Sequence, residues 1–131
     1  MTESIEVSTV LPVRAKHLYE AWLNADEHAA FTGDPATCEP VVGGRFTAGG
    51  DYISGSNVAL EPYRRIVQRW RTTEFPAGSA DSVLEVLLEE LQDGTRLILR
   101  HSNIPAGQGE MYRQGWQQYY LEPLRAYFAS A

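Results

Sequence analysis

The C-terminal segment from Gln108 to Phe128 constrains the fold most, because it carries a stripe of aromatic side chains at helical spacing. Tyrosine, tryptophan, leucine and phenylalanine recur there every three or four residues, which predicts one long helix with an apolar face. Pro123 removes one helical hydrogen bond, so we expect a bend in the last turns. Such a face is not stable in water, and the rest of the chain must cover it.

The remainder of the chain predicts strands and two short helices. Glycine pairs between residues 38 and 74 are typical of hairpin turns, and the Asp93-Gly94 pair predicts another hairpin. A helix is expected from Val13 to about Asn24, followed by a second helix with Asp26 as its N-cap. The expected strands are residues 4–11, 38–42, 45–49, 51–60, 64–74, 82–91 and 95–101.

This order of elements predicts an α+β fold as a single domain over residues 1–131. A curved antiparallel sheet of about six to seven strands would wrap around the C-terminal helix, with the two short helices after the first strand. The space between the sheet and that helix is where a ligand would bind.

Composition excludes several classes of protein. The formal net charge of −6 disfavours nucleic acid and anionic membrane surfaces, whose binding depends on cationic side chains. The single cysteine, Cys38, cannot form an internal disulfide, and the N-terminus lacks a signal peptide pattern. We therefore expect a cytoplasmic protein without nucleic-acid or membrane partners, either monomeric or a homodimer.

Six segments in order carry a family resemblance that covers nearly the whole chain. They are EAWLNADEHAAFTG, VGGRFTAGGDYISG, RRIVQRWR, FPAGSADSVLEVLLEE, GTRLILRHSNIP and GWQQYYLEPLRAYF. Together they resemble the START-like (SRPBCC) superfamily, in its bacterial branch related to the C-terminal domain of the activator of heat-shock protein 90 ATPase. The resemblance implies a helix-grip (START-like, Bet v-like) fold with a mostly apolar internal cavity.

The resemblance leaves function open, because this superfamily includes binders, polyketide cyclases, self-resistance proteins and members without an assigned role. We expect binding of a small apolar or aromatic molecule. One alternative is a cavity enzyme of the polyketide cyclase/dehydratase type, and another is a module that modulates a chaperone ATPase. The eukaryotic activator has an N-terminal domain with no counterpart in these 131 residues.

Candidate ligand-binding residues lie on predicted inward faces. Alternation in TRLILRH puts His101 on the same face as two leucines, at or near the cavity, although a satisfied core histidine is the alternative. Gly115 either packs against a strand or makes room for a ligand, and the aromatic candidates either line the cavity or fill the core. The candidates are Trp70, Leu97, Leu99, His101, Tyr112, Trp116, Tyr119 and Tyr120.

Signals for catalysis or metal binding are weak. His17 and Glu20 have a spacing that metal sites use, but no third ligand has a compelling spacing. Cys38 has no positioned partner, and Ser54-Gly55-Ser56 lacks the glycine spacing of a nucleophile elbow. We therefore predict no catalytic residue, no metal and no cofactor, and we place binding ahead of catalysis.

Overall fold

The computed structural model describes residues 1–129 and contains a seven-stranded antiparallel sheet. Its spatial order is β1-β7-β6-β5-β4-β3-β2. The strands are β1 (Thr2–Leu11), β2 (Thr37–Cys38), β3 (Arg45–Ala48), β4 (Ile53–Glu61), β5 (Arg65–Thr72), β6 (Ser82–Leu91) and β7 (Gly94–Pro105). The expected helix-grip architecture is confirmed.

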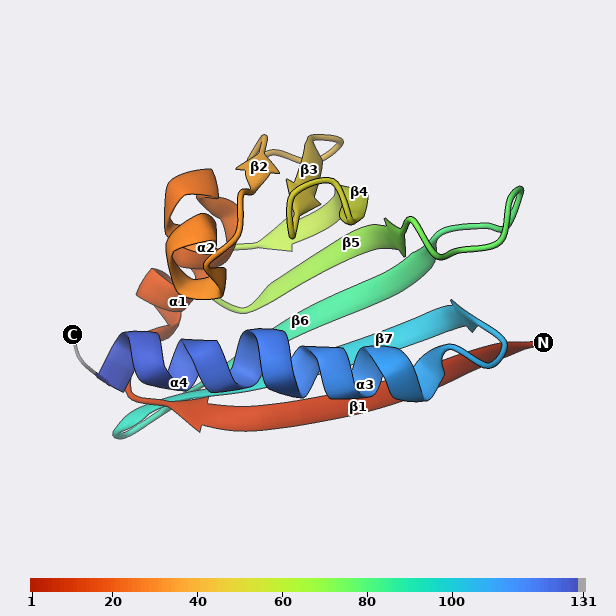
Figure 1. Ribbon diagram of the computed structural model, residues 1–131. Coiled ribbons are helices and arrows are strands. Elements are labelled where there is room, and N and C mark those ends of the chain that lie inside the picture. Colours follow the sequence, from red (N-terminus) through yellow and green to blue (C-terminus); the bar gives the residue numbers. More distant parts are fainter. Residues whose placement is uncertain (130–131) are drawn as a thin grey trace.

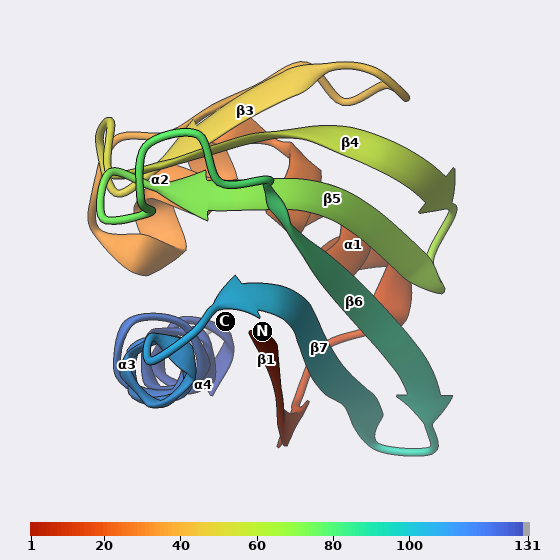
Figure 2. The same ribbon diagram turned by 90° about the vertical axis from the view of Figure 1, so that its right-hand side faces the viewer.

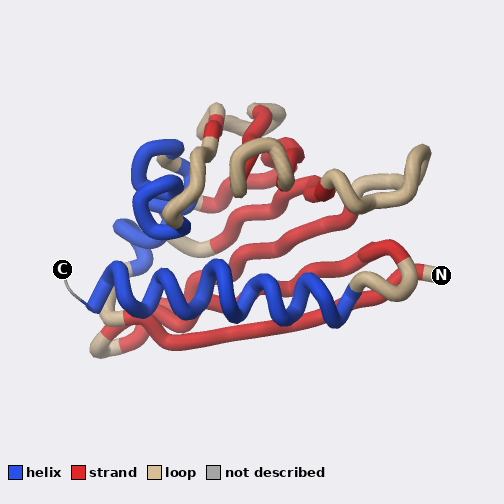
Figure 3. Tube along the Cα trace, in the orientation of Figure 1, coloured by secondary structure: helices blue, strands red, loops and turns tan. Residues whose placement is uncertain are grey.

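The C-terminal helix lies in the concavity of this sheet. It comprises α3 (Gly109–Trp116), the π-helical segment η1 (Gln117–Leu121) and α4 (Glu122–Ala129). Figure 1 shows it running alongside β1 and β7, and Figure 2, which views it end on, shows the sheet curving around it. The two short helices, α1 (Ala15–Leu23) and α2 (Ala25–Thr32), follow β1 and close one end of the fold (Figure 3).

A π-helical segment lies just before Pro123, where the sequence predicts a bend. The Glu122 amide donates to the carbonyl oxygen of Gln117, five residues earlier, so one helical turn is widened just before the proline. A π turn inside an α-helix inserts one extra residue and rotates the faces of the next helical turns. The wider π turn therefore comes directly before the turn that contains Pro123.

Two local expectations were wrong. The N-cap of α2 is Asn24, whose side chain accepts a 2.9 Å hydrogen bond from the Glu27 amide, and Asp26 instead lies in the first turn. The strand expected at 38–42 ends at Cys38, and the chain then forms a loop. This loop is tied to β4, because the buried Asn57 side chain donates to the carbonyl oxygens of Glu39 and Val41 at 3.0 and 3.2 Å.

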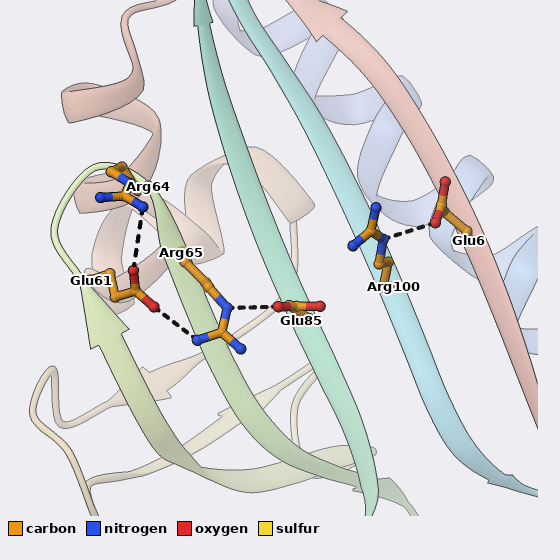
Figure 4. Close-up of polar contacts among 6 residues, drawn as sticks. All are labelled: Glu6, Glu61, Arg64, Arg65, Glu85 and Arg100. Atoms are coloured by element: carbon orange, nitrogen blue, oxygen red, sulfur yellow. Dashed lines mark hydrogen bonds and ion pairs between the residues drawn. The ribbon is translucent and has the colours of Figure 1, made fainter.

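The outer face of the sheet carries charged pairs across neighbouring strands (Figure 4). Arg65 on β5 contacts Glu85 on β6 at 2.6 Å and Glu61 on β4 at 2.8 Å. Arg100 on β7 contacts Glu6 on β1 at 2.9 Å. The inner face instead holds apolar residues at alternate positions. Charged side chains therefore lie on the outer face and core side chains on the inner face, as the alternation predicts.

Candidate functional site

A pocket of about 300 Å³ lies between the C-terminal helix and one end of the sheet. It collects residues from the end of α2 and the loop after it, the β3–β4 turn, the start of β4, β5, α3 and η1. They are Thr32, Asp34, Gly49, Tyr52, Ile53, Trp70, Met111, Tyr112, Gly115, Trp116, Tyr119 and Tyr120. The pocket thus forms where the helix passes the tips of the sheet.

Trp70 forms the floor of the pocket together with two aromatic rings of α3. It points inward from β5 and is 3% exposed. Its ring centre lies 5.1 Å from that of Tyr112 and 5.4 Å from that of Trp116, which follows Tyr112 by about one helical turn. The inward face of one strand and one face of a helix therefore build this aromatic surface.

Hydroxyl groups on one wall of the pocket are held by the protein. The Tyr112 hydroxyl donates to Oε1 of Gln108 at 2.8 Å and accepts from the Thr72 hydroxyl at 2.6 Å. The Tyr52 hydroxyl donates to the Glu74 carboxylate. Burial raises the pKa of both tyrosines above its ordinary value, so these phenols stay neutral at physiological pH.

Tyr120 is fixed from the other side by His28. Nδ1 of His28 faces the Trp22 carbonyl oxygen at 2.9 Å, and a carbonyl only accepts, so Nδ1 carries the proton. Nε2 then accepts from the Tyr120 hydroxyl at 2.8 Å. Burial lowers the pKa of His28, and the neutral ring holds the tyrosine in place.

His101 belongs to a buried hydrogen-bond chain behind the pocket. Nε1 of Trp116 donates to its Nδ1 at 3.1 Å, so Nε2 carries the proton and donates to the Ser82 hydroxyl at 2.7 Å. Ser82 in turn donates to the Trp70 carbonyl oxygen at 2.6 Å. Burial lowers the pKa of His101 to about 3, so the ring is neutral at pH 7.

The structure brings together five of the eight candidate residues from the sequence. The pocket-lining members are Trp70, Tyr112, Trp116, Tyr119 and Tyr120. Tyr119 is 63% exposed and lies at the rim. The other three, Leu97, Leu99 and His101, face inward as the alternation predicts, but they are not part of the pocket lining.

The aromatic floor of the pocket lies against His101 and separates it from the open space. His101 contacts both Trp70 and Trp116, with ring centres 4.5 and 5.8 Å apart. A second void below Trp22, Trp70 and Trp116 measures about 10 Å³, which holds one water molecule at most. The centre of the grip is therefore packed, and the open space lies to one side of it.

Several lining residues had no sequence signal of their own. Asp34, Gly49 and Tyr52 lie in loops or turns, where no periodic pattern marks a face. Gly115 was ambiguous, and the structure resolves it. A Cβ atom there would have Cδ2 of Tyr119, 4.0 Å away, as its nearest neighbour, so no strand packs against this glycine and the space belongs to the pocket.

The weaker candidates from the sequence have structural partners. His17 pairs with Glu27 at 2.6 Å, whereas Glu20 pairs with Lys16 at 3.0 Å. Cys38 is half-buried, and burial raises the pKa of its thiol. Within residues 1–129, no three or more His, Cys, Asp or Glu side chains gather into a group that could hold a metal ion, and no helix is both long and apolar enough to cross a membrane.

The sequence match to a known protein family covers almost the whole chain. The sequence pattern of one family, described as Activator of Hsp90 ATPase homolog 1-like protein, matches residues 12–129, which include every lining residue of the pocket. The chain belongs to this family. The human activator of 90 kDa heat shock protein ATPase homolog 1 is 33% identical over 113 residues, which cover 86% of this chain and 33% of the human protein. The chain thus spans about a third of the length of that relative.

Two solved structures share the fold of this chain. An Hsp90 activator from Plasmodium falciparum is 24% identical and superposes with a TM-score of 0.87, with 96% of each chain covered. The Aha1 dimer from Colwellia psychrerythraea is 17% identical, with a TM-score of 0.77 and 95% of each chain covered. At these identities the likeness establishes the family's helix-grip fold for this chain.

Proposed function

We propose that this protein binds a small apolar or aromatic molecule in the pocket beside the C-terminal helix. The observation that carries the proposal is an open space of about 300 Å³ walled mainly by aromatic side chains. Ligand sites in proteins are typically concave, mostly apolar and about 300–1,000 Å³ in volume, with a few polar groups that orient the ligand. This pocket lies at the small end of that range, so we expect a ligand of one or two rings.

The affinity expected for such a ligand is modest. Removing about 400 Å² of combined ligand and pocket surface from water is worth about 10 kcal/mol. Loss of translational and rotational freedom costs at least about 4 kcal/mol of this. The remainder is at most about 6 kcal/mol, which corresponds to a dissociation constant of tens of micromolar or weaker.

The occupied histidine nitrogens favour binding over catalysis of the cyclase or dehydratase type. A general base must bring a free lone pair within hydrogen-bond reach of the substrate. The acceptor nitrogen of His28 is taken by Tyr120, and that of His101 is taken by Trp116. Both histidines therefore hold aromatic side chains of the pocket in place, His28 holding Tyr120 and His101 holding Trp116.

A fluorescence titration with the neutral two-ring naphthylamine probe 6-propionyl-2-(dimethylamino)naphthalene tests the proposal. Binding should enhance the emission of the probe and quench Trp70 and Trp116, which line the pocket. Gly115→Leu should abolish the signal, because Gly115 lines the pocket and the new side chain would take the space of the ligand. Gln114→Leu adds the same side chain at an exposed helix position outside the lining, and it should bind like the parent protein.

Two results would contradict the proposal. One is the absence of saturable binding by this probe and by a panel of one-ring and two-ring aromatic compounds, measured by fluorescence and by thermal shift. The other is binding that Gly115→Leu leaves unchanged, which would place the ligand elsewhere.

Modulation of a chaperone ATPase is a second candidate, favoured by the 33% identity to the human activator. Because the chain covers only a third of that protein, we expect little change when it is added to a heat-shock protein 90 ATPase assay. Stimulation at micromolar protein, unaffected by Gly115→Leu, would instead support a role as an interaction module. Sedimentation of the same samples would show whether the protein is a monomer or a homodimer.

A further inference from the structure

The charge around the pocket has a single sign. Asp34, in the loop after α2, is the one charged residue in the lining, and no lysine or arginine lies there among the described residues. No hydrogen bond or ion pair engages its carboxylate within residues 1–129; the Thr32 hydroxyl bonds instead to its backbone. Asp34 therefore offers a free negative charge at the mouth of the pocket.

A second carboxylate lies behind one wall. Glu74 follows β5 and accepts a hydrogen bond from the hydroxyl of the lining residue Tyr52. Burial raises the pKa of Tyr112 and of Tyr120; the charge of Glu74 adds to the rise at Tyr112, and the charge of Asp34 adds to the rise at Tyr120. Both carboxylates are thus close enough to act on phenol groups that line the pocket.

The neighbouring basic side chains do not offset these charges. On β5, Arg71 pairs with Asp81 at 2.7 Å, and its guanidinium stacks on Phe75. On α3, Arg113 pairs with Glu110 and lies outside the lining. Both of these cations have a carboxylate partner, so neither cancels the charge of Asp34.

Aromatic faces add to this preference. Tyrosine and tryptophan rings attract cations through their electron-rich faces, by about 0.5–2 kcal/mol per contact depending on solvent exposure. The pocket presents Tyr52, Tyr112, Tyr119 and Tyr120 along with Trp70 and Trp116. The combination of these rings with an unpaired carboxylate suits a cation that is itself apolar.

We propose that the ligand of this pocket is a hydrophobic organic ammonium ion, with its aromatic or alkyl body on the Trp70 floor and its positive charge toward Asp34. This inference rests on the proposed binding function and specifies its ligand class. A strongly hydrated primary ammonium would lose more solvation on entry than an alkylated one. Tertiary and quaternary ammonium groups are therefore the preferred class.

A pair of ligands with the same shape tests the preference for positive charge separately from the fit of the apolar body to the pocket. Phenyltrimethylammonium and tert-butylbenzene have the same shape and differ by one positive charge. We expect the cation to bind about fivefold more tightly or better in calorimetric or competition titrations at low salt. About 1 M sodium chloride should reduce that preference, because salt screens the interaction with an exposed carboxylate.

Variants locate the source of the preference. Asp34→Asn should weaken binding of the cation by about fivefold and leave the neutral isostere unchanged. Asp93→Asn, in the turn between β6 and β7 and outside the lining, makes the same change in net charge and should leave both affinities unchanged. Far-ultraviolet circular dichroism and the melting temperature of each variant establish that it is folded.

The outcomes separate the two proposals. Equal affinity for the two isosteres, or tighter binding of the neutral one, overturns the ammonium inference while ligand binding stands. An equal loss of cation affinity in Asp34→Asn and Asp93→Asn also overturns it, because the preference would then come from net charge alone. If neither isostere nor the neutral naphthylamine probe binds, both proposals fail.

Discussion

The indole Nε1 of Trp116 donates a hydrogen bond to Nδ1 of His101 at 3.1 Å, in the buried interior of the grip. Indole nitrogen is only a donor, so this contact requires a neutral imidazole with its proton on Nε2. Protonation of Nδ1 would place two donors face to face. The hydrogen bond that joins the C-terminal helix to β7 therefore exists only when the His101 ring is neutral.

We predict that acid destabilises the protein through His101. Its pKa falls from 6.5 to about 3 on folding, so between these values the unfolded chain binds a proton that the folded protein does not. The free energy of unfolding therefore decreases as the pH falls from 6.5 toward 3, by up to about 1.4 kcal/mol per pH unit. The buried His28, whose pKa is also lowered, adds a loss of the same sign.

Urea denaturation between about pH 4.5 and 7.5 measures this slope. His101→Gln should be less stable than the parent at neutral pH by about 1–3 kcal/mol, because it disturbs a buried hydrogen-bond chain. Its stability should fall less steeply in acid, with the remaining slope due in part to His28. Parallel curves for parent and variant would contradict the assignment of the slope to His101.

Gly115→Ala should stabilise the protein by about 0.5–1 kcal/mol, because alanine restricts the unfolded chain and suits a helix interior. The added Cβ has room, with Tyr119 at 4.0 Å as its nearest neighbour. Gly55→Ala is the matched contrast, since its Cβ would overlap the Arg69 carbonyl oxygen on the paired strand. Thermal and urea unfolding should move in opposite directions for the two variants.

Asn57→Ala should destabilise the protein by about 2 kcal/mol or more, because it leaves buried polar groups without partners. The Asn57 side chain donates to the carbonyl oxygens of Glu39 and Val41, and its oxygen accepts from Gln68 at 2.9 Å. Ser56→Ala, on the neighbouring position of β4, should have a much smaller effect. Hydrogen exchange should also speed up at the amides of Gly43 and Gly44, which donate to the backbone carbonyl oxygens of Asn57 and Val41. Unchanged protection there would show that Asn57 does not hold the loop.

Glu3→Ala should loosen the start of the C-terminal helix. The Glu3 carboxylate accepts hydrogen bonds from the amides of Gly107 and Gly109 at 2.9 and 2.7 Å, and these bonds lower its pKa. Amide exchange at both glycines should be faster in the variant, and in the parent the protection should be lost as pH falls through the carboxylate pKa. Glu3→Gln, which keeps one acceptor oxygen, should retain part of the protection.

Patterns repeated along the chain were enough to predict the architecture. Hairpin turns at glycine pairs, alternation through Leu97 and Leu99, and the aromatic stripe from Tyr112 to Phe128 predicted the sheet, its inward face and the helix it surrounds. These features depend on the local backbone and on burial of one face, which the order of residue types specifies. The exceptions were local choices with close alternatives, such as Asn24 in place of Asp26 as the N-cap of α2.

The candidate site depended on tertiary structure. An inward-facing side chain is equally apolar in a core or in a pocket, so the sequence did not distinguish Trp116, which lines the open space, from Leu99, which does not. Asp34, Tyr52 and Gly115 meet only because a loop, a turn and a helix converge from distant parts of the chain. Residue order determined which faces are buried, whereas the curvature of the sheet and the path of the helix across it decided where space and charge remain.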